Sequence, residues 1–245
     1  MSYAFCIVSV APIRVKPEHE AEMCSQLLFG EHVEILSAPV KGFVEISCSH
    51  DGYKGFCAVN QLLETNEGYI TSHALAGNWL NTMYDRSGHV IRIPFGSPLP
   101  EVLRKYFDFS SIDSWNTSTF SEDKLLEIVG IYMNSPYLWG GRSVFGLDCS
   151  GFSQAVARIF GVSLLRDAWQ QAEAGKDISY GKHSAGDLAF FDLDGTIVHV
   201  GVITGLGEIA HAFGKIRKDY FTEAGIMNRD TGLITHSLHS IKRIL

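Results

Sequence analysis

The chain has 245 residues, with 20 Lys or Arg against 27 Asp or Glu and a formal net charge of −7 at pH 7. A chain of this length holds about two or three compact units. The acidic balance argues against binding to nucleic acid or to an anionic surface, and the sequence has no apolar run of about 18 residues or more that would span a membrane.

Short apolar runs separated by turn residues occupy the first quarter of the chain. Pro and Gly are frequent between the runs, which are 3–10, 26–28, 32–36, 43–48 and 56–59. Short strands at such close spacing predict a small β-barrel over residues 1–63. The apolar N-terminus carries no positively charged region, so we interpret it as the first strand and not as a secretion signal.

A second unit of similar character is predicted over residues 64–118. Its apolar segments are 69–71, 79–81 and 89–93, and a segment rich in Pro follows at 94–100. We interpret this unit as a second small barrel. A stretch rich in Ser, Thr and Asn, 110–119, then connects it to the rest of the chain.

A helix start is predicted where the third domain, residues 119–245, begins. Thr119 and Glu122 have the spacing of a capping box, in which each side chain satisfies a backbone N–H of the first turn. Apolar residues with helical spacing follow, from Leu125 to Met133.

A cysteine at the start of a second predicted helix is the strongest chemical signal in the chain. Cys149 follows a loop rich in Gly, shares a helix face with Phe152 and Val156, and is followed by a plausible stop at Gly161. Unpaired N–H groups and the helix dipole stabilise a thiolate at such a position, so we predict an ionised nucleophile. The alternative is a small buried apolar residue, which is the role of most free cysteines.

Two histidines lie on a predicted hairpin downstream. Alternating valines place His199 on one face of a strand, and His211 lies on the run that follows a loop centred on Gly205. That centre places the two histidines directly opposite each other, with Cβ atoms about 4.5 to 5.5 Å apart. One imidazole can then orient the other, as a Cys-His-X triad requires. The alternatives are structural histidines or a metal site, but Cys149 has no familiar zinc-ligand spacing.

These motifs, in this order, resemble the NlpC/P60 family of cysteine peptidases. The matching segments are Tyr137-x-Trp139-Gly140-Gly141, Asp148-Cys149-Ser150-Gly151-Phe152, Gly186-Asp187-Leu188-Ala189-Phe190-Phe191, His199-Val200-Gly201-Val202 and His211-Ala212. The resemblance implies an α+β fold with a papain-like core, in which helices pack on an antiparallel sheet. It also implies cleavage of peptide bonds in bacterial cell-wall stem peptides.

The resemblance assigns a role to each residue of the expected catalytic site. Cys149 would be the nucleophile, His199 the general base, and His211 the residue that orients the base. Tyr137 matches a family tyrosine whose hydroxyl lies beside the site and would help to hold the oxyanion, a contact typically worth about 2.7 to 4 kcal/mol. No metal and no other cofactor is expected.

The first domain adds a second resemblance, carried by residues 26–33 and 51–56, to bacterial SH3 (SH3b) domains. In the subgroup that joins SH3b to a γ-D-glutamyl-L-diamino acid endopeptidase, a barrel tyrosine and the residues beside the nucleophile recognise the free amine of an N-terminal L-Ala. By motif, these residues are Tyr53, Asp148 and Ser150, and Glu22 is a candidate second carboxylate. The alternatives are an ordinary barrel aromatic for Tyr53 and a solvated charge for Glu22.

One position departs from the subgroup, because Ala168 follows Arg-Asp where its members often carry Ser. We nevertheless expect a cytoplasmic endopeptidase that cuts L-Ala-γ-D-Glu-diamino acid peptides during recycling of the cell wall, without nucleic acid or membrane partners. Five cysteines without a CxxC motif fit a reducing compartment. The alternatives are a secreted wall hydrolase anchored by its barrels, a wall-peptide sensor without turnover, and an acyltransferase. The sequence does not define the oligomeric state.

Overall fold

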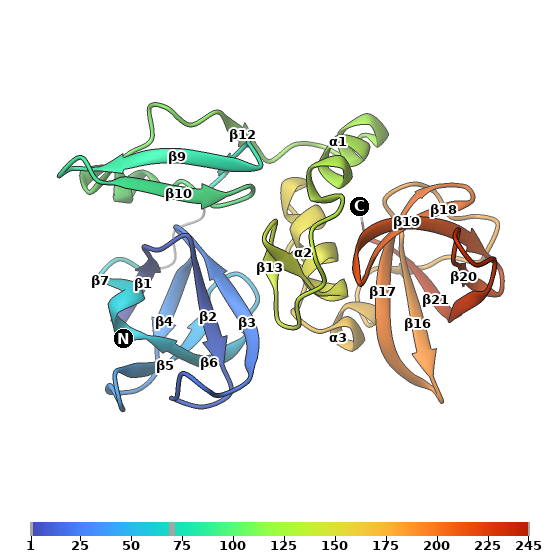
Figure 1. Cartoon of the computed structure of the whole chain (residues 1–245), viewed down its shortest axis with the longest axis horizontal. Coiled ribbons are helices and arrows are strands. Elements are labelled where there is room, and N and C mark those ends of the chain that lie inside the picture. The colour runs from blue at the N-terminus through green and yellow to red at the C-terminus, as the bar shows by residue number, and fades with distance from the viewer. Residues whose placement is uncertain (1, 69–71, 245) are drawn as a thin grey trace. The chain divides into compact units, whose positions relative to one another are not determined.

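The computed structural model describes residues 2–68 and 72–244. It divides into two compact units (Figure 1). The first unit comprises Met1–Thr117 and Trp139–Val144, and the second comprises Ser118–Leu138 and Phe145–Leu245. The chain therefore leaves the second unit after Leu138, contributes a short segment to the first, and returns at Phe145. The apolar segment 69–71 of the predicted second barrel lies outside the described residues.

The N-terminal part of the first unit is a strongly curved antiparallel sheet. Its strand order is β3-β2-β6-β5-β4-β1-β7, and a 3-10 turn, η1 (Val59–Gln61), precedes the last strand. The strands are β1 (Ser2–Cys6), β2 (Val10–Arg14), β3 (Met23–Leu28), β4 (His32–Ile35), β5 (Phe43–Cys48), β6 (Lys54–Ala58) and β7 (Leu62–Thr65). Small and branched apolar side chains fill its interior, including Ala11, Ile13, Leu27 and Ile46. The barrel-rich N-terminal region expected from the short apolar runs is confirmed.

The rest of the first unit consists of two small sheets and a 3-10 helix. Their strand orders are β10-β9-β11 and β12-β8. The elements are β8 (Ala74–Ala76), β9 (Leu80–Asp85), β10 (Val90–Pro94), η2 (Glu101–Lys105), β11 (Phe107–Asp108), β12 (Ser114–Asn116) and, from the returning segment, β13 (Arg142–Ser143). Apolar residues between 74 and 112 share one cluster with Phe5, which lies on β1, and with Phe29, which follows β3.

The second unit places three helices around a sheet that closes on itself. Its strand order is β15-β21-β16-β17-β18-β19-β20, and β21 pairs with β20 as well as with β16. The elements within the described residues are α1 (Glu122–Tyr132), β14 (Gly146–Leu147), α2 (Cys149–Ile159), α3 (Ala168–Ala172), β15 (Lys176–Asp177), β16 (Leu188–Leu193), β17 (Thr196–Gly205), β18 (Glu208–Phe213), β19 (Lys215–Thr222), β20 (Gly225–Met227) and β21 (Ile234–Arg243).

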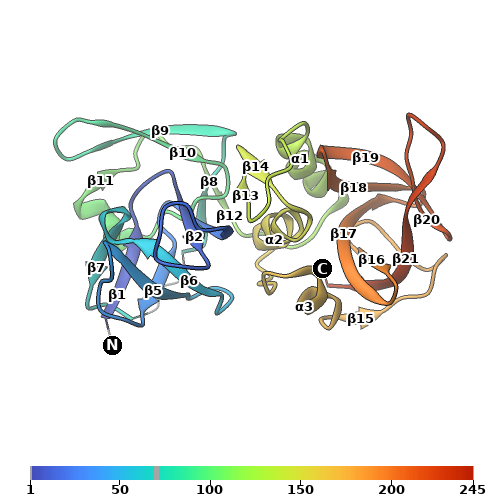
Figure 2. The same cartoon turned by 60° about the horizontal axis from the view of Figure 1, so that its bottom comes forward.

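The expected antiparallel sheet is present, and its strands make up most of the unit, whereas the helices are few and short. Strands β16 to β21 curve round on themselves (Figure 2), and they carry more of the unit than its short helices do. Helix α2 packs against β17. That contact is what matters for the site, because it brings the start of α2 to the strand that carries His199.

Both longer helices are defined by their ends and by their apolar faces. Helix α1 begins two residues later than a cap at Thr119 would allow, because the Ser121 side chain accepts the N–H of Lys124 and serves as the N-cap. Helix α2 spans Cys149–Ile159 and buries Phe152 and Val156. Gly161 follows with a φ of 75°, the left-handed conformation that ends a helix at little steric cost.

Among the described residues, no helix has both the length and the apolar character that a membrane crossing requires.

Candidate active site

The nucleophile candidate is held at the first position of α2. Asp148 is the N-cap, and its Oδ1 accepts the Gly151 N–H at 2.7 Å. The cysteine is only 8% exposed, and its sulfur accepts a hydrogen bond from the backbone of Val200. Val200 follows His199 on β17, so the packing of α2 on β17 places the sulfur next to the predicted base.

The charge state of Cys149 differs from the sequence-based expectation. Burial, followed by the nearby Asp148 carboxylate, raises the pKa of Cys149 to about 11, and the N–H groups of Val200 and Ser150 offset only part of that rise. The prediction of a resting thiolate, which considered the helix terminus alone, is therefore wrong. The thiol is protonated at neutral pH, and it needs a base when it attacks.

The two hairpin histidines meet, although in a different register from the one predicted. His211 lies opposite Gly201, not opposite His199, because Gly205 pairs with Glu208, so that the hairpin turns at Leu206 and Gly207 and not at Gly205. His199 is therefore a diagonal neighbour of His211. Its Nε2 lies 2.9 Å from His211 Nδ1, so the diagonal pair is still in hydrogen-bond contact.

A carboxylate that the sequence analysis missed completes a row of side chains that runs from Cys149 through His199 and His211. Asp219 on β19 is fully buried, and its Oδ2 lies 3.0 Å from His211 Nε2. Arg217 and the backbone N–H of Arg229 also donate to this carboxylate. The signal for it was present, since pairing β18 with β19 around Gly214 places Arg217 opposite His211 and Asp219 two residues further along.

Asp219 is ionised under all working conditions. Burial alone would raise the pKa of Asp219, but hydrogen bonds from His211, from the Arg229 N–H and from Arg217 outweigh it and hold the pKa well below its usual range. A buried carboxylate with this many donors is a fixed negative charge.

The fixed charge on Asp219 determines the tautomer of both histidines. A carboxylate only accepts, so His211 Nε2 carries the proton and donates to it. With that proton on Nε2, Nδ1 of His211 is the acceptor for the proton of His199 Nε2. This leaves His199 Nδ1 unprotonated and available as the base for the Cys149 thiol.

The base is uncharged at rest. Burial, followed by repulsion from His211 and His236, lowers the pKa of His199 well below its ordinary value of 6.5. A neutral thiol thus meets a neutral imidazole, and both charges appear only when the proton moves from sulfur to nitrogen.

His236 is a further histidine that the sequence analysis did not single out. Its ring stacks on that of His199 with centroids 4.3 Å apart and 24° between the planes. The nitrogens of His199, His211 and His236 lie within 4.8 Å of one another, close enough to consider a metal ion. Lone pairs lie in the ring planes, however, so two stacked rings do not direct theirs to one point. The distance of 2.9 Å between His199 and His211 is also that of a hydrogen bond, so the cluster is arranged as a relay and not as a ligand set.

Tyr137 lies within the electrostatic reach of the nucleophile. Burial, followed by the Cys149 and Asp148 side chains, raises the pKa of Tyr137 to about 12, so its hydroxyl keeps its proton. Its backbone N–H donates to the Gly214 carbonyl at 2.9 Å, which anchors the loop before α2 to the segment after β18.

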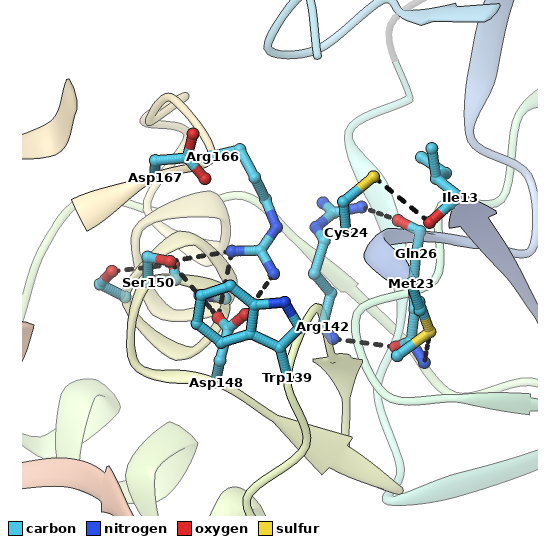
Figure 3. Close-up of polar contacts among 12 residues, drawn as sticks. Ile13, Met23, Cys24, Gln26, Trp139, Arg142, Asp148, Ser150, Arg166 and Asp167 are labelled. Carbon is cyan, nitrogen blue, oxygen red and sulfur yellow. Dashed lines mark hydrogen bonds and ion pairs between the residues drawn. The ribbon is translucent and has the colours of Figure 1, made fainter. Parts of the chain in front are cut away.

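An arginine to which the sequence analysis gave no role in the site joins the residues beside Cys149. Arg166 is 2% exposed and reaches both oxygens of Asp148, at 3.0 and 2.5 Å, and the Ser150 hydroxyl at 2.8 Å (Figure 3). Asp148 therefore caps α2, and its charge is balanced by a guanidinium. Its predicted part in binding a substrate amine stays a prediction.

The other two predicted amine contacts, Glu22 and Tyr53, lie in the first unit. Glu22 Oε1 accepts the Trp139 indole N–H at 2.7 Å, and Tyr53 packs against the core of the first sheet. Trp139 is part of the segment that the chain lends to this unit. Arg142 anchors the same segment through a buried ion pair with Glu31, at 2.8 Å, and through the Gln26 carbonyl, at 2.7 Å.

Comparisons with family models match both halves of the chain. The model of the NlpC/P60 family matches residues 134–235, and that of the bacterial dipeptidyl-peptidase Sh3 domain matches residues 13–62. A γ-D-glutamyl-L-lysine dipeptidyl-peptidase of Bacillus subtilis is 29% identical over 211 residues, which are 77% of this chain and 71% of the relative. Dipeptidyl-peptidase 6 of Lysinibacillus sphaericus is 24% identical over 77% of this chain and 81% of its own.

Solved structures show the same fold. An NlpC/P60 family protein from Bacillus cereus superposes with a TM-score of 0.81 at 18% identity, covering 98% of this chain and 99% of its own. An NlpC/P60 endopeptidase from Photobacterium damselae gives a TM-score of 0.71 at 15% identity, covering 98% of this chain and 70% of its own.

Proposed function

We propose that this chain, a cysteine peptidase with an NlpC/P60 domain and a bacterial SH3 domain, hydrolyses the γ-D-glutamyl-diamino acid bond of cell-wall peptides that begin with a free L-Ala. The proposal rests on the row Cys149, His199, His211 and Asp219, which lies in a domain of the type that the relatives share. Two relatives, from Bacillus subtilis and Bacillus cereus, are named as γ-D-glutamyl-L-lysine dipeptidyl-peptidases, which supports L-Lys as the diamino acid and removal of an N-terminal dipeptide.

The reaction begins with proton transfer. His199 Nδ1 takes the proton of the Cys149 thiol as the sulfur attacks the γ-carbonyl of D-Glu. The tetrahedral intermediate then collapses, the C–N bond breaks, and His199 returns the proton to the leaving amine. Water hydrolyses the thioester with His199 again as the base. The products are L-Ala-D-Glu and the peptide that begins with the diamino acid.

Two donors are available for the oxyanion of the tetrahedral intermediate. The backbone N–H of Cys149 is a helix N-terminal donor, and the Tyr137 hydroxyl keeps its proton because its pKa is raised to about 12. Removing one such donor costs about 2.7 to 4 kcal/mol of transition-state stabilisation in other hydrolases. We propose Tyr137 for this role.

Recognition of the free amine is the second part of the proposal. We assign it to Tyr53, Glu22, Asp148 and Ser150. An ammonium needs a carboxylate whose charge is not already balanced. Asp148 is paired with Arg166, whereas Trp139 donates to Glu22 without bringing a charge. We therefore propose Glu22, ahead of Asp148, as the principal carboxylate that binds the amine.

The test uses L-Ala-γ-D-Glu-L-Lys, its N-acetylated form, and the corresponding peptide with meso-diaminopimelate. We expect release of L-Ala-D-Glu, detected by mass spectrometry, from the free amine only. Equal cleavage of the acetylated peptide would contradict amine recognition. Cleavage of purified sacculi, with retention of the protein on them, would instead favour a wall hydrolase anchored by its SH3 domain.

Matched variants separate catalysis from recognition. Cys149→Ala should abolish cleavage of every peptide. Tyr53→Phe and Glu22→Gln should lower kcat/KM for the free peptide by about 3-fold to 10-fold each, which is the scale of one hydrogen bond. His89→Gln, an exposed histidine of the first unit, serves as the control.

The cellular setting is also proposed, namely recycling of wall peptides in the cytoplasm. All five cysteines lie within the described residues, and none forms a disulfide. Free thiols are the usual state in a reducing compartment. Fractionation of cells that produce the full chain, with detection by antibody, checks the location.

A further inference from the structure

His236 stands next to the catalytic row without a part in the proton transfers described above. It lies on β21, where its backbone pairs with Ile226 of β20. Its ring is stacked on that of His199, with 4.3 Å between centroids and 24° between planes. It is the only ring among the described residues that lies nearly parallel to the base.

The His236 ring is itself held from several sides. Phe213 meets it at 89° with 5.3 Å between centroids, and Phe191 meets it at 64° with 6.0 Å. Its Nδ1 lies 2.9 Å from the Thr235 hydroxyl. Because these contacts come from β16, from the end of β18 and from β21 itself, the ring has a fixed plane against which the base rests.

The imidazole of His199 needs a neighbour that keeps it from rotating. His199 meets His211 edge-on at 81°, and it meets Phe191 only at a tilt of 42°. Rotation of the imidazole about its Cβ–Cγ bond would break the hydrogen bond to His211 and turn Nδ1 away from the sulfur. A parallel ring at van der Waals distance blocks that rotation, because the turned ring would collide with it.

The charge of His236 also suits this position. Burial, followed by repulsion from His211, lowers the pKa of His236 to about 4, and Asp219 opposes that shift. Cys149 on α2, His211 on β18, Asp219 on β19 and His236 itself are the titratable groups around the base. An uncharged ring at neutral pH presents a π-face to His199, which does not repel the imidazolium formed during attack.

We propose that His236 is a positioning residue that holds the imidazole plane of His199, so that Nε2 stays on His211 and Nδ1 stays directed at the Cys149 sulfur. The proposal depends on the cysteine peptidase chemistry of this site and not on which peptide is cut. Two readouts separate it from a purely structural role. They are the division of the effect between kcat and KM, and the tautomer of His199.

The experiment compares His236→Leu, which removes the flat ring, with His236→Phe, which keeps it, and with the control His239→Leu on the same strand. In His236→Leu we expect kcat to fall about 10-fold to 100-fold with KM changed less than about 2-fold, the effect of a misoriented catalytic group. His236→Phe should restore most of kcat, and His239→Leu, whose side chain is exposed and lies by Asp192, should match the parent protein.

Nitrogen chemical shifts of ¹⁵N-labelled histidine provide the test that needs no substrate. The parent protein and His236→Phe should show His199 as a single tautomer protonated at Nε2, whereas His236→Leu should show a mixture. A failed substrate assignment would leave these shifts unchanged, so the two proposals fail independently.

Two results would overturn the positioning role. One is a His236→Leu protein with the kcat and the single His199 tautomer of the parent. The other is a His236→Phe protein that loses as much kcat as His236→Leu, since the flat face would then not be the feature that matters. If His236→Leu does not fold, as judged by circular dichroism, His236→Gln replaces it with the same expectations.

Discussion

Four side chains in a row carry the chemistry, and Asp219, the last of them, holds a fixed negative charge. The Asp219 carboxylate fixes His211, His211 fixes His199, and His199 faces a protonated Cys149. The negative charge thus acts through two imidazoles, and it does so by selecting tautomers. This is why a side chain distant from the sulfur is expected to affect turnover.

Replacing Asp219 by Asn tests that transmission. An amide can donate to His211 Nε2, which would put the His211 proton on Nδ1, turn the tautomer of His199 and protonate its Nδ1. We expect kcat to fall by about 10² to 10⁴-fold, the usual contribution of general acid–base catalysis, with KM nearly unchanged. Steady-state kinetics on the cleaved peptide measures this effect.

Asp230→Asn is the matched control, because Asp230 is a second, mostly exposed partner of the same Arg217. It should retain parent kcat. Equal losses in the two variants would mean that Arg217 pairing in general, and not the His211 contact, sets the activity.

The raised pKa of Cys149 predicts a distinctive pH profile for its modification. A thiol with a pKa of about 11 has only a small thiolate fraction at pH 7. The rate of alkylation by iodoacetamide, followed by mass spectrometry with Cys149→Ala as the blank, should therefore keep rising between about pH 8 and pH 10. A rate that has already levelled off below pH 8 would show that a thiolate–imidazolium pair exists at rest.

At the scale of elements, the capped start of α2 holds the nucleophile in place. Helix α2 is capped by Asp148, and Arg166 fastens that cap. On β17, a Cβ at Gly201 would lie 2.7 Å from Ile209 Cδ1, so a larger residue there would have to displace the Ile209 side chain. The glycine of the His-Val-Gly-Val motif thus leaves space for Ile209 beside the pair of Gly201 with His211.

The ion pair of Arg142 with Glu31 should be a major support of the segment 139–144. Both side chains are 5% exposed or less, so loss of the carboxylate removes a negative charge in direct contact with a buried guanidinium. Glu31→Ala should lower the free energy of unfolding of the first unit by about 3 to 5 kcal/mol. Urea unfolding followed by tryptophan fluorescence measures the change.

Glu18→Ala removes a carboxylate from the exposed ion pair with Lys41 and serves as the control. Its unfolding midpoint should not move. A Glu31→Ala midpoint equal to that of the parent would contradict the assigned role of the buried pair.

At the scale of the whole molecule, the two units are not consecutive pieces of the chain. Residues Trp139–Val144 belong to the first unit, although they lie between parts of the second. A fragment of residues 118–245 therefore keeps Arg142 and Trp139 but lacks Glu31 and Glu22. It should melt at a lower temperature than the full chain, or aggregate, in a thermal unfolding scan.

The full chain with Cys149→Ala, which is inactive but keeps both units, is the reference for that scan. A fragment that unfolds cooperatively at the temperature of the reference would show that the segment 139–144 needs no partner from the first unit.

Local patterns in the sequence were sufficient to identify much of the site. Helical spacing and a cap located Cys149 at the start of α2, and strand alternation around a loop rich in Gly located His199 and His211 on one hairpin. Both patterns depend only on residues that are close together in the sequence, so they can be recognised without knowledge of the fold. The domain boundaries at 63 and 118 stay predictions.

The tertiary structure alone decided how these residues work. The turn at Leu206 and Gly207 set the register of the hairpin, and closure of the strands brought His236 over the base. Asp219 became the end of the row, because β19 pairs with β18. The protonation state of Cys149 depends on burial and on the Asp148 charge, which local spacing does not determine. The sequence thus determined which groups lie near one another along a helix or a hairpin. The pKa values, tautomers and ring orientations follow from packing between elements, because desolvation and charge act through space.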